Sequence, residues 1–419
     1  TGEKETFKEG KLSKGAQERL LVVRKAFADG FLQKIIDECR SPVALYPDIA
    51  QEHIELLSKL VDSVTSEVGR AVVGLAVMQL CIKTIAPEQS IRLHKGGNSY
   101  GATRFSWEEG IPMRSLDKSF VTPVLRDNDL LRVNADGFMM TRSLAENYPY
   151  SRLYKAAIRG ARKEWIEIVD LLELGELEPA TALRMVIRLL LNRSHSFTES
   201  ADATLGVISQ VISLKPLADQ VVNFLSTYIQ NATYSARLLE VAMHSLYQAL
   251  EDRQFLEGDL KPLSQMRSAN KKHGNVADVE LTVAGTKFEI LEAWDAKYGK
   301  PYLRDELEEL NEKLREHSET NIVGFVVDSE PDLTSDIVDR VEELQSIHDV
   351  EIYLLSFRNW SEQTLSQAGA EQDKTALEWL VAFTESVCQR RRNRAPIDEP
   401  SDEWIKSLRI IATDFFGLG

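Results

Sequence analysis

The spacing of the apolar residues changes at about Gly274. In the blocks 15–85 and 154–256, apolar residues recur at the spacing of one face of an α-helix. After Gly274, short alternating or continuously apolar runs are separated by amphipathic segments. A segment with a helical period cannot bury the same residues as a strand. The chain is therefore predicted to join a large, mainly helical N-terminal region to an α/β (α+β) region.

The α/β region begins with a predicted β-hairpin. Its strands are expected at 276–281 and 288–297, and Ala284 and Gly285 between them favour a turn. The elements expected after the hairpin are a helix at 303–317, a strand at 322–327, a helix at 336–347, a strand at 350–357, and C-terminal helices at 375–392 and 403–411. This order predicts a mixed central sheet flanked by helices.

The composition is that of an ordinary globular protein, with 43% hydrophobic and 27% charged residues. Cys39, Cys81 and Cys388 lie far apart without metal-ligand spacing, which is typical of a reducing cytoplasm and argues against a disulfide framework. The apolar run 71–82 is too short to span a bilayer, so a buried helix is expected there and no membrane partner. The sequence has no P-loop, so ATP is not an expected partner.

The predicted hairpin carries two acids and a lysine. Asp295 and Lys297 are two residues apart on a strand and should point to the same face, where Asp278 on the other strand can meet them. Glu280 shares the face of Asp278 and is a candidate for a further metal ligand. Mg²⁺ is bound by one or two carboxylates together with substrate phosphate, and a nearby lysine can stabilise the charge that develops on the phosphate. The hairpin therefore predicts a metal-dependent phosphodiesterase site.

An acid-x-Lys triplet is a weak signal by itself. The sequence contains two others, at 9–11 and 259–261, but they lie in a polar leader and at a helix–loop junction. The triplet at 295–297 lies on a predicted strand, with an acidic strand before it and an alternation of helices and strands after it. The alternative is an exposed hairpin with solvated charges.

The segment 260–357 resembles the PD-(D/E)xK nuclease core, and its setting resembles a type II restriction endonuclease. Asp278 corresponds to the first acid of the motif, although Ala277 replaces the usual proline, and Asp295-Ala296-Lys297 corresponds to (D/E)xK. The resemblance implies Mg²⁺-dependent cleavage of double-stranded DNA at a specific short sequence, usually by a homodimer. Asp278, Asp295 and Lys297 would then be catalytic, and Asp278 and Asp295 would hold the metal.

Two alternatives remain open. The motif also occurs in DNA repair and junction-resolving nucleases, and the same fold could belong to a non-catalytic DNA-binding protein. Some such nucleases carry a further acid on the helix before the first strand, but 263–273 contains none, so the number of metal ions stays open.

The net charge of −15 does not favour DNA binding, but its distribution is uneven. Residues 92–163 contain thirteen Lys/Arg and seven Asp/Glu, a net charge of +6, which leaves −21 for the remainder. This basic island overlaps the region 86–150, where glycines and prolines predict loops and a few short strands. A local basic surface of this kind is typical of a DNA-contacting region.

Basic and amide side chains of the island are the candidates for DNA contact, because they can reach base edges or phosphates. The first candidates are Arg92, His94, Lys95, Asn98, Tyr100, Arg104 and Arg114, followed by Arg126, Arg132 and Arg142. Lys271 and Lys272 could contact a phosphate beside the hairpin. The alternative is pairing of these side chains with neighbouring acids or with solvent. For the arginines at 390–394, interaction with a helix C-terminus is favoured over phosphate contact.

Four regions are therefore predicted. They are a helical N-terminal region at 1–85, a loop-rich basic DNA-recognition region at 86–160, a helical bundle at 161–259 and a nuclease domain with C-terminal helices at 260–419.

Overall fold

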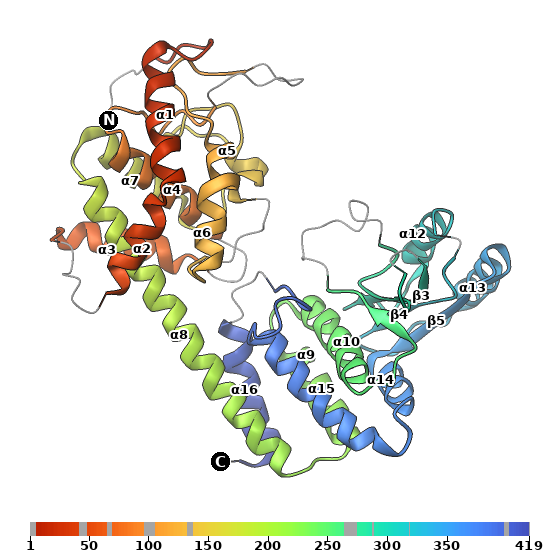
Figure 1. The fold of residues 1–419 in the computed structure, drawn as a ribbon. Helices are drawn as coiled ribbons and strands as arrows, with labels where there is room; N and C mark the ends of the chain where they lie inside the picture. Colours follow the sequence, from red (N-terminus) through yellow and green to blue (C-terminus); the bar gives the residue numbers. More distant parts are fainter. Residues whose placement is uncertain are drawn as a thin grey trace. The chain divides into compact units, whose positions relative to one another are not determined.

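The computed structural model describes residues 6–41, 48–64, 69–95, 105–131, 137–263, 275–286, 289–317, 319–397 and 402–418 (Figure 1). The chain divides into two compact units, one up to Thr198 and the other from Glu199 onward. The division falls inside the long helix α8 (Pro179–Ser213). The two parts of α8 thus belong to different units. The boundary between the units lies within 161–259, where a single helical bundle was expected.

The first unit is mainly helical, as predicted. Its helices are α1 (Lys14–Ala28), α2 (Phe31–Arg40), α3 (Gln51–Asp62), α4 (Arg70–Ile85), α5 (Met113–Leu116), a π-helical turn (Asp117–Val121), α6 (Thr122–Asp127), two 3₁₀ turns (Phe138–Met140 and Arg142–Leu144), α7 (Arg162–Leu174) and the first part of α8. Nearly every residue of α4 is buried, which confirms the buried helix expected at 71–82. No helix in the described part of the chain has the length and apolar character needed to cross a membrane.

The prediction of short strands between 86 and 150 is wrong for the residues that the structure describes there. They form short helices and turns, and their β pairing is limited to an isolated bridge between Glu9 and Trp107. Pro112 immediately precedes α5, where the missing proline N–H leaves no helical hydrogen bond unmade. Pro123 is the second residue of α6, which continues directly from the π-helical turn at 117–121. Both prolines thus lie in helical segments, although the sequence pattern suggested loops.

The second unit contains the mixed sheet that the sequence predicts, together with helices. Its elements are the rest of α8, α9 (Ala218–Asn231), α10 (Ser235–Asp252), β1 (Gly258–Leu260), β2 (Val279–Val283), β3 (Ile290–Lys297), α12 (Arg304–Leu314), β4 (Ile322–Val327), α13 (Ser335–His348), β5 (Glu351–Ser356), α14 (Phe357–Ser366), a 3₁₀ turn (Gly369–Glu371), α15 (Gln372–Val387) and α16 (Asp402–Phe416). The short strand β1 and the helix α14 were not predicted.

The five strands of this sheet, as far as the chain is described, follow the order β1-β2-β3-β4-β5. The β1–β2 and β2–β3 pairs are antiparallel, whereas the β3–β4 and β4–β5 pairs are parallel. Helices α12 and α13 pack on one face through a core that includes Leu307, Ile337 and Phe325. Helices α10 and α14 contact strands of the same sheet through other residues (Figure 1). The two faces of the sheet at β3 thus contact different helices.

Gly324 on β4 is required by the close approach of the Trp294 ring. A Cβ built at Gly324 would lie 2.1 Å from Trp294 Cζ3 and 2.9 Å from the Tyr353 carbonyl oxygen. We expect Gly324→Ala to lower the free energy of unfolding by about 1–3 kcal/mol, because the indole must leave its site. Gly206→Ala on α8 is the control, since its Cβ meets nothing within 4 Å. Thermal unfolding of both variants tests this, and equal melting temperatures would contradict it.

Candidate functional site

The hairpin register brings Asp278 and Asp295 together. Val279 of β2 pairs with Trp294 of β3, and the same register continued by one residue sets Asp278 opposite Asp295. The two carboxyl groups are hydrogen-bonded to each other, and the backbone N–H of Ala296 donates to Asp278 Oδ2 at 3.1 Å. This is the arrangement expected from the spacing of the two acids.

The pKa values of the two aspartates shift in opposite directions. Burial and the negative charge of Asp295 raise the pKa of Asp278 well above its usual range. Burial acts on Asp295 in the same direction, but the hydrogen bond from Asp278 and the charge of Lys297 outweigh it and lower the pKa of Asp295. Two like charges this close in a largely buried site cannot both form cheaply, so the charged form is favoured on Asp295 and the protonated form on Asp278.

Lys297 is the positively charged residue beside the two aspartates. Its Nζ lies 2.8 Å from Asp295 Oδ2 and 6.0 Å from the centroid of the Phe325 ring. Burial alone would lower the pKa of Lys297, but the charges of Asp295 and Asp278 raise it above 10.5. Lys297 therefore stays protonated at neutral pH and can stabilise negative charge, but it cannot act as a general base there.

Helix α10 contributes a third acid, Glu240, that the sequence did not single out. The charges of Asp295 and Lys297 both act on its carboxylate, and Glu240 in turn raises the pKa of Asp278. Burial raises the pKa of Glu240 itself, although the ion pair with buried Arg237 opposes this effect. No local motif marks Glu240, because its position depends on how α10 packs against β3.

Contacts on the opposite side of the hairpin hold α10 in this position. The Tyr247 hydroxyl on α10 donates to Glu292 Oε1 of β3 at 2.6 Å, and the Trp294 indole N–H donates to the same oxygen. Tyr247 lies seven residues from Glu240, two turns along the same face of α10, so this bond helps to hold that face against the strand that carries Asp295.

Glu280 has a structural role and does not join the aspartate pair. Its Oε1 accepts hydrogen bonds from the backbone N–H groups of Val276 and Ala277 at 2.5 and 3.2 Å. Its Oε2 lies 2.7 Å from Lys261 Nζ. Both oxygens are thus bonded within the loop that precedes β2, which corrects the expectation that Glu280 could serve as a metal ligand. Lys261 itself belongs to one of the two rival triplets.

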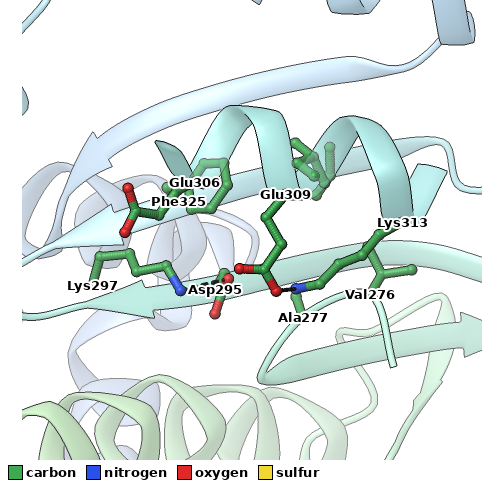
Figure 2. A pocket seen from close by; sticks show the side chains of 10 residues that line it. Val276, Ala277, Asp295, Lys297, Glu306, Glu309, Lys313 and Phe325 are labelled. Carbon is green, nitrogen blue, oxygen red and sulfur yellow. Dashed lines mark ion pairs between the residues drawn. The ribbon is translucent and has the colours of Figure 1, made fainter. Parts of the chain in front are cut away.

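A small pocket opens beside Asp295 and Lys297 under α12 (Figure 2). Its volume is about 10 Å³, close to the space that one water molecule requires. Glu306, Glu309 and Lys313 of α12 also line it, and the sequence had not marked them. The Glu309 and Lys313 side chains extend from the helix toward Asp295 (Figure 2).

The residues present suit Mg²⁺ chemically. Asp278 and Asp295 supply hard oxygen donors, and the raised pKa of Asp278 marks a site where added positive charge is favourable. The described residues contain no group of three or more His, Cys, Asp or Glu side chains arranged to hold a metal ion. Mg²⁺ usually retains several waters and uses only one or two carboxylates together with substrate phosphate. The aspartate pair alone can therefore meet its needs.

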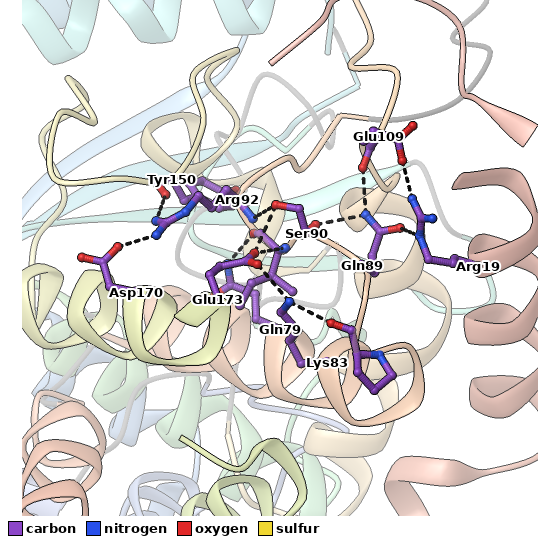
Figure 3. A network of polar contacts seen from close by, with 12 residues as sticks. Arg19, Gln79, Lys83, Gln89, Ser90, Arg92, Glu109, Tyr150, Asp170 and Glu173 are labelled. Atoms are coloured by element: carbon purple, nitrogen blue, oxygen red, sulfur yellow. Dashed lines mark hydrogen bonds and ion pairs between the residues drawn. The ribbon is translucent and has the colours of Figure 1, made fainter. Parts of the chain in front are cut away.

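Arg92 in the first unit is structural, which corrects its assignment as a first-choice DNA contact. Its Nη2 lies 2.7 Å from Asp170 Oδ1 on α7, and its Nη1 donates to the Tyr150 carbonyl oxygen at 2.9 Å (Figure 3). The side chain is 7% exposed. The surrounding network also includes the ion pair between Lys83 and Glu173 at 2.9 Å (Figure 3). These bonds fix the segment that precedes residue 96 against α4 and α7.

His94 is likewise buried, and its ring stacks on Tyr150 with centroids 4.4 Å apart. Burial and the charge of Lys95 lower the pKa of His94 to about 4, so the imidazole is neutral at physiological pH. Lys95 is partly buried and bonds to Asn147 Oδ1. His94 thus has neither the charge nor the exposure of a phosphate ligand.

The other candidates for DNA contact divide into two groups. Arg114 and Arg142 are exposed, and Arg126 is partly buried. Those that lie outside the described residues are Asn98, Tyr100, Arg104, Arg132, Lys271 and Lys272.

Three arginines near residue 390 form ion pairs with acidic side chains, whereas interaction with a helix C-terminus was expected. Arg390 pairs with Asp202, Arg391 with Asp252 and Glu385, and Arg394 with Asp252 and Glu251.

No protein-family model matches this chain, and no curated protein matches it significantly.

Proposed function

We propose that the protein is a Mg²⁺-dependent nuclease with a PD-(D/E)xK core that hydrolyses phosphodiester bonds of double-stranded DNA in the cytoplasm. The observation that carries the proposal is the buried Asp278–Asp295 pair with Lys297 2.8 Å from Asp295. A buried acid pair that retains a proton at a pocket is unfavourable for folding alone, and such groups concentrate at functional sites.

Each side chain has a distinct role in this reaction. Asp278 and Asp295 would hold Mg²⁺, which when bound polarises the phosphate and lowers the pKa of a water molecule. Lys297 offers a permanent positive charge to the phosphate oxygens as the new P–O bond to water forms and the P–O bond to the sugar breaks. Glu240 adds negative charge beside the pair. Arg237 keeps that carboxylate oriented.

Sequence-specific cleavage in the manner of a type II restriction endonuclease is the finer part of the proposal. It rests on the resemblance of 260–357 and on the net positive charge of 92–163. Cutting both strands of a palindromic site requires two active sites related by a twofold axis, so a homodimer is part of the proposal. ATP is not required.

Incubation with plasmid DNA and MgCl₂, with EDTA as the negative control, tests the proposal. Discrete fragments whose sequenced ends share one short sequence are expected. Cleavage limited to branched or mismatched duplexes would replace this function with repair or junction resolution. DNA binding without metal-dependent cleavage would replace it with a non-catalytic role.

We expect Glu240→Gln to raise the Mg²⁺ concentration for half-maximal cleavage by about 10–100-fold, because groups that tune metal ligands typically have effects of this size. Glu362→Gln on α14 is the matched control, since Glu362 forms only an exposed ion pair with Arg358. Mg²⁺ titrations of cleavage rate measure the effect. The same half-maximal concentration in both variants would exclude Glu240 from the site.

A further inference from the structure

Helix α12 places a second lysine at the pocket, in addition to Lys297. Lys313 lines the same pocket as Asp295, and its positive charge contributes to the lowered pKa of Asp295. Its side chain is only 13% exposed, so it lies along the wall of the pocket and does not extend into solvent (Figure 2). Lys313 is therefore part of the electrostatic environment of the aspartate pair.

Lys313 forms a weak ion pair with Glu309. Glu309 Oε1 lies 3.4 Å from Lys313 Nζ, compared with 2.8 Å between Asp295 and Lys297. The Glu309 side chain is 54% exposed, and ion pairs between residues four apart on a helix stabilise only weakly. Glu309 can thus turn to solvent at little cost.

The other glutamate at the pocket is fixed. Glu306 is 10% exposed and pairs with Lys300 at 2.6 Å. A pocket of about 10 Å³ accepts one water-sized group but no phosphate. Rotation of Glu309 outward would enlarge the opening and free the Lys313 ammonium in the same movement.

We propose that Lys313 binds a backbone phosphate of the nucleic acid at this pocket, and that Glu309 occupies Lys313 until the phosphate displaces it. This inference rests on the proposed nuclease function and extends it to substrate binding. Glu309 then acts as a competitor that weakens binding of any polyanion, because its carboxylate and the phosphate cannot share the same ammonium.

The test is binding of a fluorescently labelled duplex of mixed sequence by anisotropy, in Ca²⁺ and over a series of KCl concentrations. Lys313→Met should weaken binding about 10-fold, as expected for loss of a charge-assisted contact. It should also lower the magnitude of the slope of log K against log [KCl] by about 0.9, the contribution of one phosphate contact. Lys313→Arg should retain the slope, and Glu309→Gln should tighten binding.

Lys406→Met on α16 is the matched control. Lys406 also pairs with an acid four residues away on its helix, Asp402, at 2.7 Å. This variant should bind as the wild type does. An unchanged slope for Lys313→Met would overturn the inference even if affinity fell, because a purely structural loss weakens binding without removing a counterion-releasing contact.

Plasmid cleavage in Mg²⁺ separates this inference from the proposed function. If the wild type binds but does not cut, the nuclease proposal fails. A smaller salt-dependence slope for Lys313→Met would still support a phosphate contact by Lys313. If the wild type cuts and the slope of Lys313→Met is unchanged, only the Lys313 inference fails. Absence of binding to any duplex by the wild type would overturn both.

Discussion

Replacing Lys297 with methionine should reduce Mg²⁺-dependent DNA cleavage by about 10²–10³-fold, the usual effect of removing one group that stabilises charge in a transition state. Lys297 is protonated and lies 2.8 Å from Asp295, so it is the nearest permanent positive charge to the proposed metal ligands. Methionine keeps most of the length of the side chain, but it removes the charge that lies near Asp295 and over the Phe325 ring.

Single-turnover cleavage of a plasmid at saturating Mg²⁺ measures this effect. Lys406→Met is again the control, because it removes a lysine from an exposed pair without altering the pocket. Asp295→Asn should abolish cleavage through loss of a metal ligand, whereas Lys297→Met should leave the Mg²⁺ dependence of the remaining activity nearly unchanged. Full activity of Lys297→Met would remove Lys297 from the mechanism.

The elements of the sheet were predictable because their signals are local. The strand predicted at 322–327 coincides with β4, and the helix at 336–347 coincides with α13 to within a residue at each end. The sequence placed Asp278 and Asp295 on the two arms of one hairpin, but a β-bulge between Leu281 and Thr282 shifts the register that sets them opposite each other. The order of helices and strands after β3, and the two acids of the site, could thus be predicted from the sequence.

The remaining features depend on packing between distant segments. Glu240 reaches the site through the packing of α10 against β3, which includes the hydrogen bond from Tyr247 to Glu292. Arg92 is buried because Asp170 on another helix accepts its guanidinium. A count of basic residues cannot distinguish such an arginine from one that faces solvent. The number of basic residues in the island therefore overestimates how many of them are available to contact DNA. Lys313 was not predicted, because a lysine in a charged amphipathic helix has no local sequence signature.

Asp278→Asn should stabilise the metal-free protein at neutral pH and abolish cleavage. Asparagine mimics the protonated acid: its oxygen can accept from the Ala296 N–H, and its amide can donate to Asp295. The folded state of the wild type keeps a proton on Asp278 that the unfolded chain loses above its usual pKa of 3.8. The folded state thus binds more protons, so the free energy of unfolding falls as pH rises from 3.8 toward the raised pKa.

Asp278→Asn has no carboxyl group at this position, so its free energy of unfolding should not fall with pH in this way. We expect a gain on the order of 1 kcal/mol at neutral pH, a size common when a functional residue is replaced by one that suits folding. For a unit of this size the melting temperature should rise by about 2–4 °C. The gain should disappear below the usual pKa of aspartic acid, where the carboxyl is protonated in both states.

In the presence of Mg²⁺, the wild type should become more stable than Asp278→Asn. A ligand that binds only the folded state stabilises it in proportion to the logarithm of its concentration over the Kd. Because Mg²⁺ competes with protonation of Asp278, whose pKa is raised, its stabilisation of the wild type should grow as pH rises, and it should be absent from Asp278→Asn. Thermal unfolding from pH 4 to 8, with Mg²⁺ or EDTA, measures both effects. A variant that is less stable than the wild type in EDTA at neutral pH, or equally stabilised by Mg²⁺, would show that the aspartate pair is an ordinary structural contact.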